Sequence, residues 1–234
     1  MIYENYNQAI VGAKESMLDQ IRYKRRVFDR YVLPQLPQSR DAAILDCGCG
    51  FGAYLVCLAE TGYRNATGID LSADQIEAAI REFGLANAKV GDVVSYLEES
   101  DQKWDIVLMM DLIEHLPVEL SVRMLTSARA RLKDGGKVIL MTPNAISPFS
   151  PYLYGDITHL RAYTVASLTQ SARLAGFGKT VVQGVEPIPV TLKTRIQALL
   201  GRFFFRPLIR LFCKSYFGWD LWGIYSANLI CTLQ

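Results

Sequence analysis

One short segment combines a carboxylate with three alternating glycines, and it runs Leu45-Asp46-Cys47-Gly48-Cys49-Gly50-Phe51-Gly52. The residues before it, from Ala42 to Leu45, form an apolar run of strand length, and those after it, from Ala53 to Ala59, have helical apolar spacing. Glycine has no Cβ, so a turn built from it can adopt positive φ and bring backbone N–H groups close to a ligand. We therefore predict a cradle for a nucleoside cofactor, with an ordinary tight turn as the alternative.

The spacing of the glycines separates two kinds of nucleotide cradle. Dinucleotide-binding turns carry G-x-G-x-x-G, whereas this turn carries G-x-G-x-G after Asp46, which disfavours a nicotinamide-dependent oxidoreductase. The segment resembles motif I of the class I S-adenosylmethionine-dependent methyltransferases, D/E-x-G-x-G-x-G, at every defined position. That resemblance implies S-adenosyl-L-methionine as the cofactor and S-adenosyl-L-homocysteine as the product. It places these residues at the cofactor: Asp46, Gly48, Cys49, Gly50 and Gly52.

Two further carboxylates each follow a predicted strand. Asp70 ends the strand at 66–70, close to the roughly 20-residue offset at which nucleotide-binding folds place a ribose-binding acid. Asp92 resembles the family's acidic position beside the adenine, with Val93 against the ring. Each carboxylate has an alternative role at the start of the helix that follows it, where Ser72 fits the N-cap after Asp70. The other predicted cofactor contacts are Leu71 and Met110.

Apolar strands that alternate with helical stretches indicate an α/β fold with a parallel sheet covered on both faces. The resemblance implies a Rossmann-like, seven-stranded methyltransferase sheet that is mostly parallel, has an antiparallel final strand and carries helices on both faces. Ligands of such sheets bind beyond the carboxyl ends of the strands, where the acidic residues fall. The expected later elements are a strand at 104–110, a turn at 134–136, a strand at 137–141, a helix at 165–175 and an antiparallel pair at 177–185 and 228–233.

The length of 234 residues fits one elaborated α/β domain. We expect an N-terminal helical cap over residues 1–40 and a class I methyltransferase domain over 41–234, with a basic amphipathic insert at about 191–219. The chain has no uninterrupted apolar stretch of the ~18 residues that span a membrane and no signal-peptide pattern, so we expect a cytoplasmic protein. The net charge of +2 argues against a nucleic-acid partner. Of the five cysteines, Cys47 and Cys49 occupy variable positions of the glycine turn and three are scattered, which predicts reduced thiols and no metal site.

Basic residues concentrate in two regions. The first is the N-terminal cap, where apolar spacing predicts a helix packed ahead of the core and where Tyr6 and Tyr23 are candidates to contact the cofactor or acceptor. The second is 191–219, where Pro207 is expected to separate two short amphipathic helices. These helices either pack on the core or make a peripheral contact with the inner face of the cell membrane or a lipid-linked acceptor. The second region has no acidic residue, and its basic residues are Lys193, Arg195, Arg202, Arg206, Arg210 and Lys214.

The chain has two histidines, and both follow predicted strands. His115 belongs to the Glu-His-Leu segment that often follows the family's fourth strand, in a structural or a catalytic role. His159 lies in 155–164, which resembles the G-D-x-T-H-x-R-x-Y/F-T segment of bacterial methyltransferases from cell-surface polysaccharide pathways. We predict that His159 takes the proton of an acceptor hydroxyl and that Asp156 orients it. Neighbouring rings and an arginine are expected to bind the acceptor, and these are Tyr152, Tyr154, Arg161 and Tyr163.

The leading hypothesis is an S-adenosylmethionine-dependent methyltransferase that O-methylates a sugar hydroxyl in cell-surface polysaccharide biosynthesis. Its acceptor is then a small molecule or a glycan, including a lipid-linked one. A second hypothesis is O-methylation of a membrane-associated quinone precursor, which shares the fold, the Glu-His-Leu segment and an amphipathic insert. A third is a binding protein that keeps the nucleoside fold without transfer activity, because an acceptor pocket evolves separately from its fold.

Overall fold

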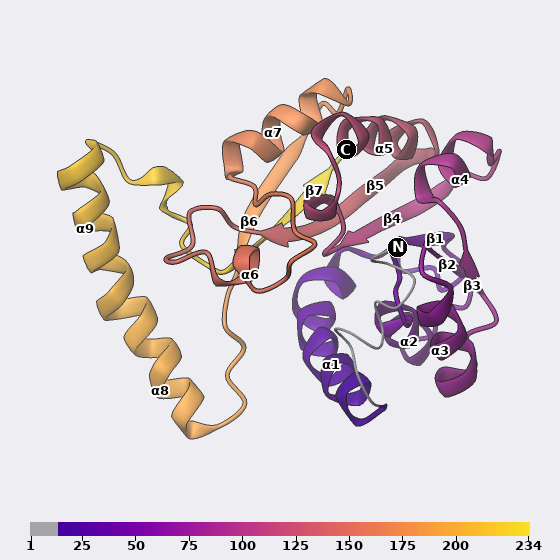
Figure 1. The fold of residues 1–234 in the computed structure, drawn as a ribbon, viewed down its shortest axis with the longest axis horizontal. Coiled ribbons are helices and arrows are strands. Elements are labelled where there is room, and N and C mark those ends of the chain that lie inside the picture. Colours follow the sequence, from indigo (N-terminus) through magenta and orange to yellow (C-terminus); the bar gives the residue numbers. More distant parts are fainter. Residues whose placement is uncertain (1–13) are drawn as a thin grey trace.

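A computed structural model describes residues 14–234 of the chain, and its centre is a single sheet of seven strands. The strand order is β3-β2-β1-β4-β5-β7-β6 (Figure 1). The strands β1 to β5 pair in parallel, whereas β7 is antiparallel to both β5 and β6. The predicted seven-stranded, mostly parallel methyltransferase sheet with an antiparallel final strand is therefore confirmed. Its strands are β1 (Ile44–Cys47), β2 (Ala66–Asp70), β3 (Ala88–Val90), β4 (Trp104–Met110), β5 (Leu132–Pro143), β6 (Thr180–Val185) and β7 (Asn228–Leu233).

Helices cover both faces of this sheet (Figure 1). On one face lie α1 (Lys14–Val27), α2 (Ala53–Glu60) and α3 (Ala73–Phe83); on the other lie α4 (Val93–Glu99), α5 (Val118–Ala130) and α7 (Val165–Leu174). Successive strand side chains point to opposite faces, so an all-apolar strand fills two cores at once. In β4, Ile106 and Leu108 pack on the first side, whereas Val107 and Met109 pack on the second.

The strand β5 begins earlier than predicted. It starts at Leu132 and contains the predicted turn at 134–136 as an irregularity, with φ of +76° at Gly135 and a shift in its register with β4 between Trp104 and Ile106. The predicted turn is wrong in this respect, because neighbouring β4 continues to pair across it and keeps the segment in the sheet.

The N-terminal helix α1 packs against α2, and the chain continues from it through a π-helical turn at Phe28–Val32. Met17, Ile21 and Phe28 are buried there, so this helix shares the core of the sheet domain. The predicted helix is confirmed for the described part, while a boundary at residue 40 stays a prediction. Tyr6 lies outside the described residues.

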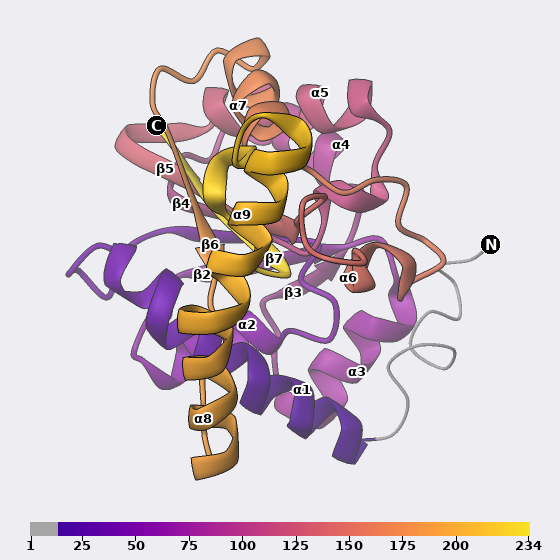
Figure 2. The ribbon, with the colours of Figure 1, turned by 90° about the vertical axis from the view of Figure 1, so that its left-hand side faces the viewer.

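The predicted break at Pro207 is wrong. Figures 1 and 2 show α8 (Leu192–Leu200), a π-helical turn (Gly201–Phe205) and α9 (Arg206–Phe217) as one helical rod beyond the β6 edge of the sheet. The wider π-helical turn precedes the proline ring, which lies in the first turn of α9, and Arg206 keeps right-handed helical dihedrals of −65° and −45°. Only Cys213 is buried along the rod, so it does not pack on the core as a whole. Across residues 14–234, no helix combines enough length and apolarity to cross a bilayer.

Candidate active site

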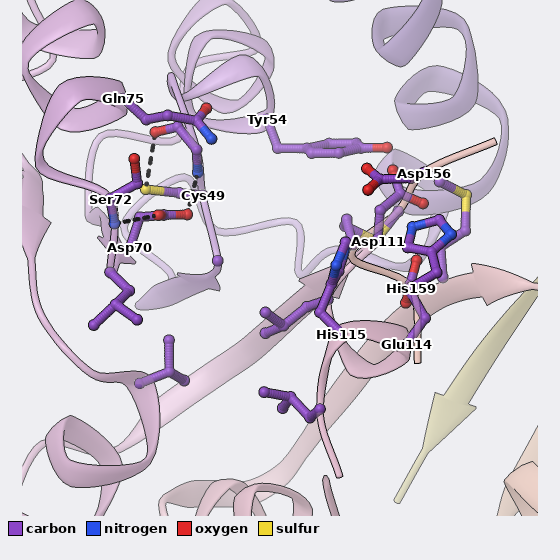
Figure 3. Close-up of a pocket in the computed structure, with 18 of the residues that line it drawn as sticks. Cys49, Tyr54, Asp70, Ser72, Gln75, Asp111, Glu114, His115, Asp156 and His159 are labelled. Carbon is purple, nitrogen blue, oxygen red and sulfur yellow. Dashed lines mark hydrogen bonds between the residues drawn. The ribbon is translucent and has the colours of Figure 1, made fainter. Parts of the chain in front are cut away.

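A cavity of about 770 Å³ lies at the carboxyl ends of β1, β2 and β4. This is the edge where parallel α/β sheets bind their ligands, and the volume suits a nucleoside cofactor together with a small acceptor. Figure 3 shows two groups of side chains around it. Cys49, Asp70 and Gln75 lie on one side, whereas Glu114 and His159 lie on the other.

The glycine turn and the end of β2 form one wall of the cavity. The N–H of Gly50 donates a hydrogen bond of 2.8 Å to Oδ2 of Asp70, which joins the two predicted motifs directly. Gly50 has φ of +55°, and a Cβ there would come within 2.8 Å of Oε1 of Gln75. A residue larger than glycine would therefore strain the turn and push against the Gln75 side chain.

Asp70 is held from two sides. Its Oδ1 accepts a 2.9 Å hydrogen bond from the N–H of Ser72, in addition to the bond from Gly50. Burial raises the pKa of Asp70, and these two N–H donors oppose that rise. The fixed carboxylate lines the cavity beside Leu71, which is 59% exposed.

Asp92 caps a helix and also lines the cavity, and its predicted place beside the adenine stays a prediction. Its Oδ1 accepts a 2.8 Å hydrogen bond from the N–H of Ser95 and so caps α4, as the alternative interpretation expects. Asp92 and Val93 also line the cavity on the side of the glycine turn, together with Gly91. A capping bond occupies one carboxylate oxygen, and the residue is still placed to meet a ligand.

Asp46 and Gly52 belong to the turn but do not line the cavity. Asp46 is 1% exposed, and its Oδ2 makes no hydrogen bond with a described residue. Burial raises the pKa of Asp46 to about 7, while the positive charge of Lys24 opposes the rise. Asp46 is thus buried beneath the turn, and direct contact of these two residues with the cofactor stays a prediction.

The acceptor side of the cavity brings the two histidines together. Their rings meet edge to face with centroids 4.6 Å apart. Nδ1 of His159 lies 2.7 Å from the backbone oxygen of Tyr152, and a carbonyl only accepts, so this nitrogen carries the proton. The nitrogen with the lone pair is then Nε2 of His159.

Asp156 reaches His115 through Thr158. The Thr158 hydroxyl donates 2.6 Å to Oδ1 of Asp156 and lies 2.9 Å from Nδ1 of His115. Burial and the neighbouring His159 lower the pKa of His115, which favours the neutral ring. The hydrogen-bond partner of Nδ1 of His159 is the Tyr152 carbonyl, and the orienting role of Asp156 toward that ring stays a prediction.

Glu114 is a functional candidate that the sequence did not indicate. It is fully buried, and neither carboxylate oxygen makes a hydrogen bond of good geometry with a described residue. Burial and the charge of Asp111 raise the pKa of Glu114 well above its ordinary value. One ligating atom each of Glu114, His115 and His159 lies within 4.8 Å of the others, although the sequence predicts no metal site.

Most of the residues that build this site lie in a stretch of the chain that matches a known family. Residues 20–182 match a family of methyltransferase domains. The chain belongs to that family. The solved structure of an S-adenosylmethionine-dependent methyltransferase from Archaeoglobus fulgidus has the same fold, with a TM-score of 0.68 and 18% identity over 95% of this chain and 100% of the other. A phosphoethanolamine N-methyltransferase of Haemonchus contortus in complex with S-adenosyl-L-methionine has a TM-score of 0.63 and 16% identity over 99% of this chain and 60% of the other.

Curated relatives match a shorter stretch of this methyltransferase. A ubiquinone biosynthesis O-methyltransferase of Serratia proteamaculans is 30% identical over 118 residues, which are 49% of this chain and 48% of that protein. The chain thus spans about half the length of the curated relatives that it matches. The cofactor of the family is S-adenosyl-L-methionine, and the acceptors of individual members differ.

Three of the residues predicted to bind the acceptor lie outside the cavity lining of this methyltransferase. Tyr163 is 1% exposed and donates from its hydroxyl to Oγ of Ser121, 3.3 Å away, because its backbone pairs with Asn144 and draws the ring into the core. Arg161 lies over the ring of Tyr163. Tyr154 is 82% exposed. These positions do not favour their predicted roles in acceptor binding, which stay predictions, while Tyr152 does line the cavity.

Two cavity residues that the sequence did not single out come from distant elements. Lys24 of α1 forms an ion pair with Asp111, with Nζ and Oδ2 3.1 Å apart, and lies 5.2 Å from the ring centroid of Tyr54. Asp111 follows β4 with φ of +58°, a left-handed conformation that disfavours residues with a Cβ. Tyr23 of α1 also lines the cavity, as predicted, and burial raises its pKa to about 12. Lysines and tyrosines on an N-terminal helix are common, so only the tertiary contact distinguishes these residues.

Proposed function

We propose that this methyltransferase transfers the methyl group of S-adenosyl-L-methionine to a hydroxyl group of a small acceptor. The observation that carries the proposal is the hydrogen bond from Nδ1–H of His159 to the Tyr152 carbonyl. It leaves the lone pair on Nε2 of the same ring free to accept a proton, and His159 lines the cavity. The sulfonium makes the methyl group electrophilic, and a hydroxyl attacks it more readily as its proton leaves. His159 accepts that proton in this proposal.

The opposite wall of the cavity suits the cofactor. In the proposal, the Asp70 carboxylate, fixed by Gly50 and Ser72, accepts hydrogen bonds from the ribose hydroxyls. Asp92 and Val93 lie beyond it at the start of α4 and flank the adenine. The methionine part of the cofactor then runs along the glycine turn toward Met110 and the histidines.

We favour a phenolic hydroxyl of a quinone-precursor type over a sugar. Arg161 and Tyr163, which were expected to bind the acceptor, lie outside the cavity lining, whereas Leu112, Leu116 and Leu120 line it. Apolar side chains favour an aromatic ring. The ubiquinone biosynthesis O-methyltransferases among the relatives support the same class. Sugar O-methylation remains the second proposal, on the resemblance of the loop that contains His159.

An assay of S-adenosylhomocysteine release tests the proposal. Catechol-type quinone precursors and nucleotide sugars are offered in parallel, and the His159→Ala variant is compared with the parent. Loss of a general base lowers turnover by about 100-fold or more, whereas Leu160→Ala, an exposed position in the same loop, changes it less than about twofold. Release with neither class would favour a non-catalytic binding protein, and full turnover in His159→Ala would remove the proposed base.

We also propose that the rod of α8 and α9 contacts an anionic membrane surface. Large apolar side chains are exposed along it, including Phe203 at 69% and Phe212 at 60%. Arg206 and Arg210 are paired with Glu186 and Asp220, which tie the rod to the domain. Four basic residues of the rod form no ion pair with a described residue, and these are Lys193, Arg195, Arg202 and Lys214. A membrane contact at this rod gives a lipid-soluble acceptor a route to the enzyme.

Vesicle flotation tests the membrane proposal. Each basic residue near an anionic surface contributes about 1 kcal/mol, so the double variant Arg202→Glu with Lys214→Glu weakens partitioning by roughly 30-fold or more. The matched control reverses two exposed charges outside the rod, Arg173→Glu with Lys179→Glu, and keeps binding. The parent floats with phosphatidylcholine and phosphatidylglycerol vesicles and much less with phosphatidylcholine alone. Equal loss in both double variants, or no flotation of the parent, contradicts the proposal.

A further inference from the structure

We propose that Glu114, His115 and His159 form a binding site for a divalent transition-metal ion on the acceptor side of the cavity. One ligating atom from each residue lies within 4.8 Å of the other two. All three residues line the cavity, where a bound ion can meet an acceptor. The inference goes beyond the proposed function. Metal binding itself does not depend on that function, and only the effect of the ion on an acceptor hydroxyl rests on it.

The hydrogen bonds around both rings determine which nitrogen faces a ligand. Nδ1 of His159 donates to the carbonyl oxygen of Tyr152, 2.7 Å away. The Thr158 hydroxyl donates to Asp156, so toward His115 its oxygen accepts from Nδ1 at 2.9 Å. Both rings therefore present the lone pair of Nε2. Behind each ring lies an acceptor for Nδ1–H, a backbone carbonyl for His159 and a carboxylate-linked hydroxyl for His115, which is the outer shell that ligating histidines usually have.

Glu114 supplies the third ligand and the reason that a cation belongs there. Both of its carboxylate oxygens lack a hydrogen bond of good geometry with any described residue, although the residue is 0% exposed. A buried polar group without a partner costs free energy, and an unpaired carboxylate costs more. The carboxylate and the two imidazole lone pairs are all hydrogen-bond acceptors with no hydrogen-bond donor between them. A metal cation accepts an electron pair from each of the three groups.

The ligand set favours zinc or a similar ion. Two imidazole nitrogens and one carboxylate oxygen match the three-ligand zinc sites of enzymes, whereas Mg²⁺ and Ca²⁺ prefer oxygen ligands. Ligands of a tetrahedral zinc ion lie about 3.4 Å apart, since each bond is about 2.1 Å long, so the three groups, which lie within 4.8 Å of one another, close by up to about 1.4 Å around the ion. Three protein ligands leave a coordination position that opens on the cavity.

That open position offers a second route to a deprotonated acceptor, in place of the general base of the proposed function. An acceptor hydroxyl bound to the ion loses its proton to water more readily, and the resulting oxyanion attacks the methyl group. His159 then acts as a ligand rather than as the proton acceptor. Acceptors that offer a phenolic oxygen to the ion fit this site.

Calorimetric titration of the full-length, tag-free protein with Zn²⁺, after removal of metal by EDTA and dialysis, tests the inference without any cofactor or acceptor. We expect one Zn²⁺ per chain and at least a tenfold weaker affinity in Glu114→Gln and in His159→Ala. Thr158→Val removes the hydroxyl that links His115 to Asp156, keeps all three ligands, and weakens binding by about tenfold. Glu119→Gln, an exposed carboxylate five positions after Glu114 in the sequence, leaves affinity unchanged.

His159 lies in a partly exposed loop, so His159→Ala keeps the fold even where a core variant does not, and circular dichroism verifies this. The chain contains no third histidine that could replace it. Absence of Zn²⁺ binding, or binding that Glu114→Gln and His159→Ala leave unchanged, overturns the inference. Zinc binding without methyl transfer would count against the proposed function alone, and methyl transfer without zinc binding would count against the metal site alone.

Discussion

Asp46 is a buried carboxyl whose ionisation the fold opposes. In an unfolded chain an aspartate titrates near pH 3.9, but burial raises the pKa of Asp46 to about 7 in the fold. Between these values the folded protein holds a proton that the unfolded chain has lost. The carboxyl therefore stabilises the fold fully below about pH 4, and this contribution is lost as the pH rises toward 7.

The pH dependence of unfolding tests this assignment. Between about pH 5 and pH 8, the Asp46 carboxyl alone lowers the free energy of unfolding by roughly 2 to 3 kcal/mol in the protein without cofactor. Asp46→Asn removes that part of the slope. Other buried carboxyls contribute equally to both proteins, so the difference between the two denaturant-unfolding series isolates Asp46. Identical slopes would mean that Asp46 is ionised normally in the fold.

At the scale of residues, the sequence predicted those neighbours in the site whose spacing along the chain is typical of a nucleotide-binding fold. The offset between the glycine turn and Asp70 predicts their proximity, and the structure joins them by the Gly50 hydrogen bond. The sequence marked Glu114 only as part of the Glu-His-Leu segment, because its burial and its missing partners arise from elements far along the chain. Tyr163 was predicted to bind the acceptor because it belongs to a loop motif. The motif does not reveal that the ring is buried in the core.

At the scale of elements, the packing of α2 depends on the last glycine of the turn. Gly52 has φ of +84°, and a Cβ there would come within 2.2 Å of Cδ1 of Leu85. Gly84, which ends α3, has φ of +66° and no atom within 4 Å of a Cβ. An alanine at either position would meet the same left-handed backbone strain, but only at Gly52 would its Cβ overlap a neighbouring side chain.

Alanine substitutions at these two glycines separate strain from overlap. Gly84→Ala lowers the free energy of unfolding by about 1 kcal/mol, through left-handed strain alone. Gly52→Ala lowers it by about 3 kcal/mol, because the overlap with Leu85 adds to the same strain. Chemical denaturation of both variants measures the difference. Equal losses would show that Leu85 moves aside without cost.

Pro207 shows why element boundaries were harder to predict than element types. The helical spacing on both sides of it predicted helices correctly, and proline usually breaks a helix. A π-helical turn at Gly201–Phe205 instead lets the chain continue as one rod. That adjustment depends on backbone geometry over a whole turn, which apolar spacing does not encode.

At the scale of the whole molecule, topology assembles the site. The strands β4 and β5 are parallel neighbours, so the segments that follow them meet at one edge of the sheet. His115 follows β4 and His159 follows β5, and their rings come into contact there. The expected α/β order predicted this edge, whereas the contact between the two rings required the packed loops. The rod lies at the β6 edge, away from the strands that carry the glycine turn (Figure 1).

Transfer of a labelled methyl group tests the central claim most directly. The protein is incubated with methyl-labelled S-adenosyl-L-methionine and a catechol-type quinone precursor, and the product is analysed by mass spectrometry. The proposal predicts the label on an acceptor oxygen, together with one S-adenosyl-L-homocysteine for each product and a loss of about 100-fold in His159→Ala. Label on nitrogen or carbon, or equal transfer by His159→Ala, would contradict it.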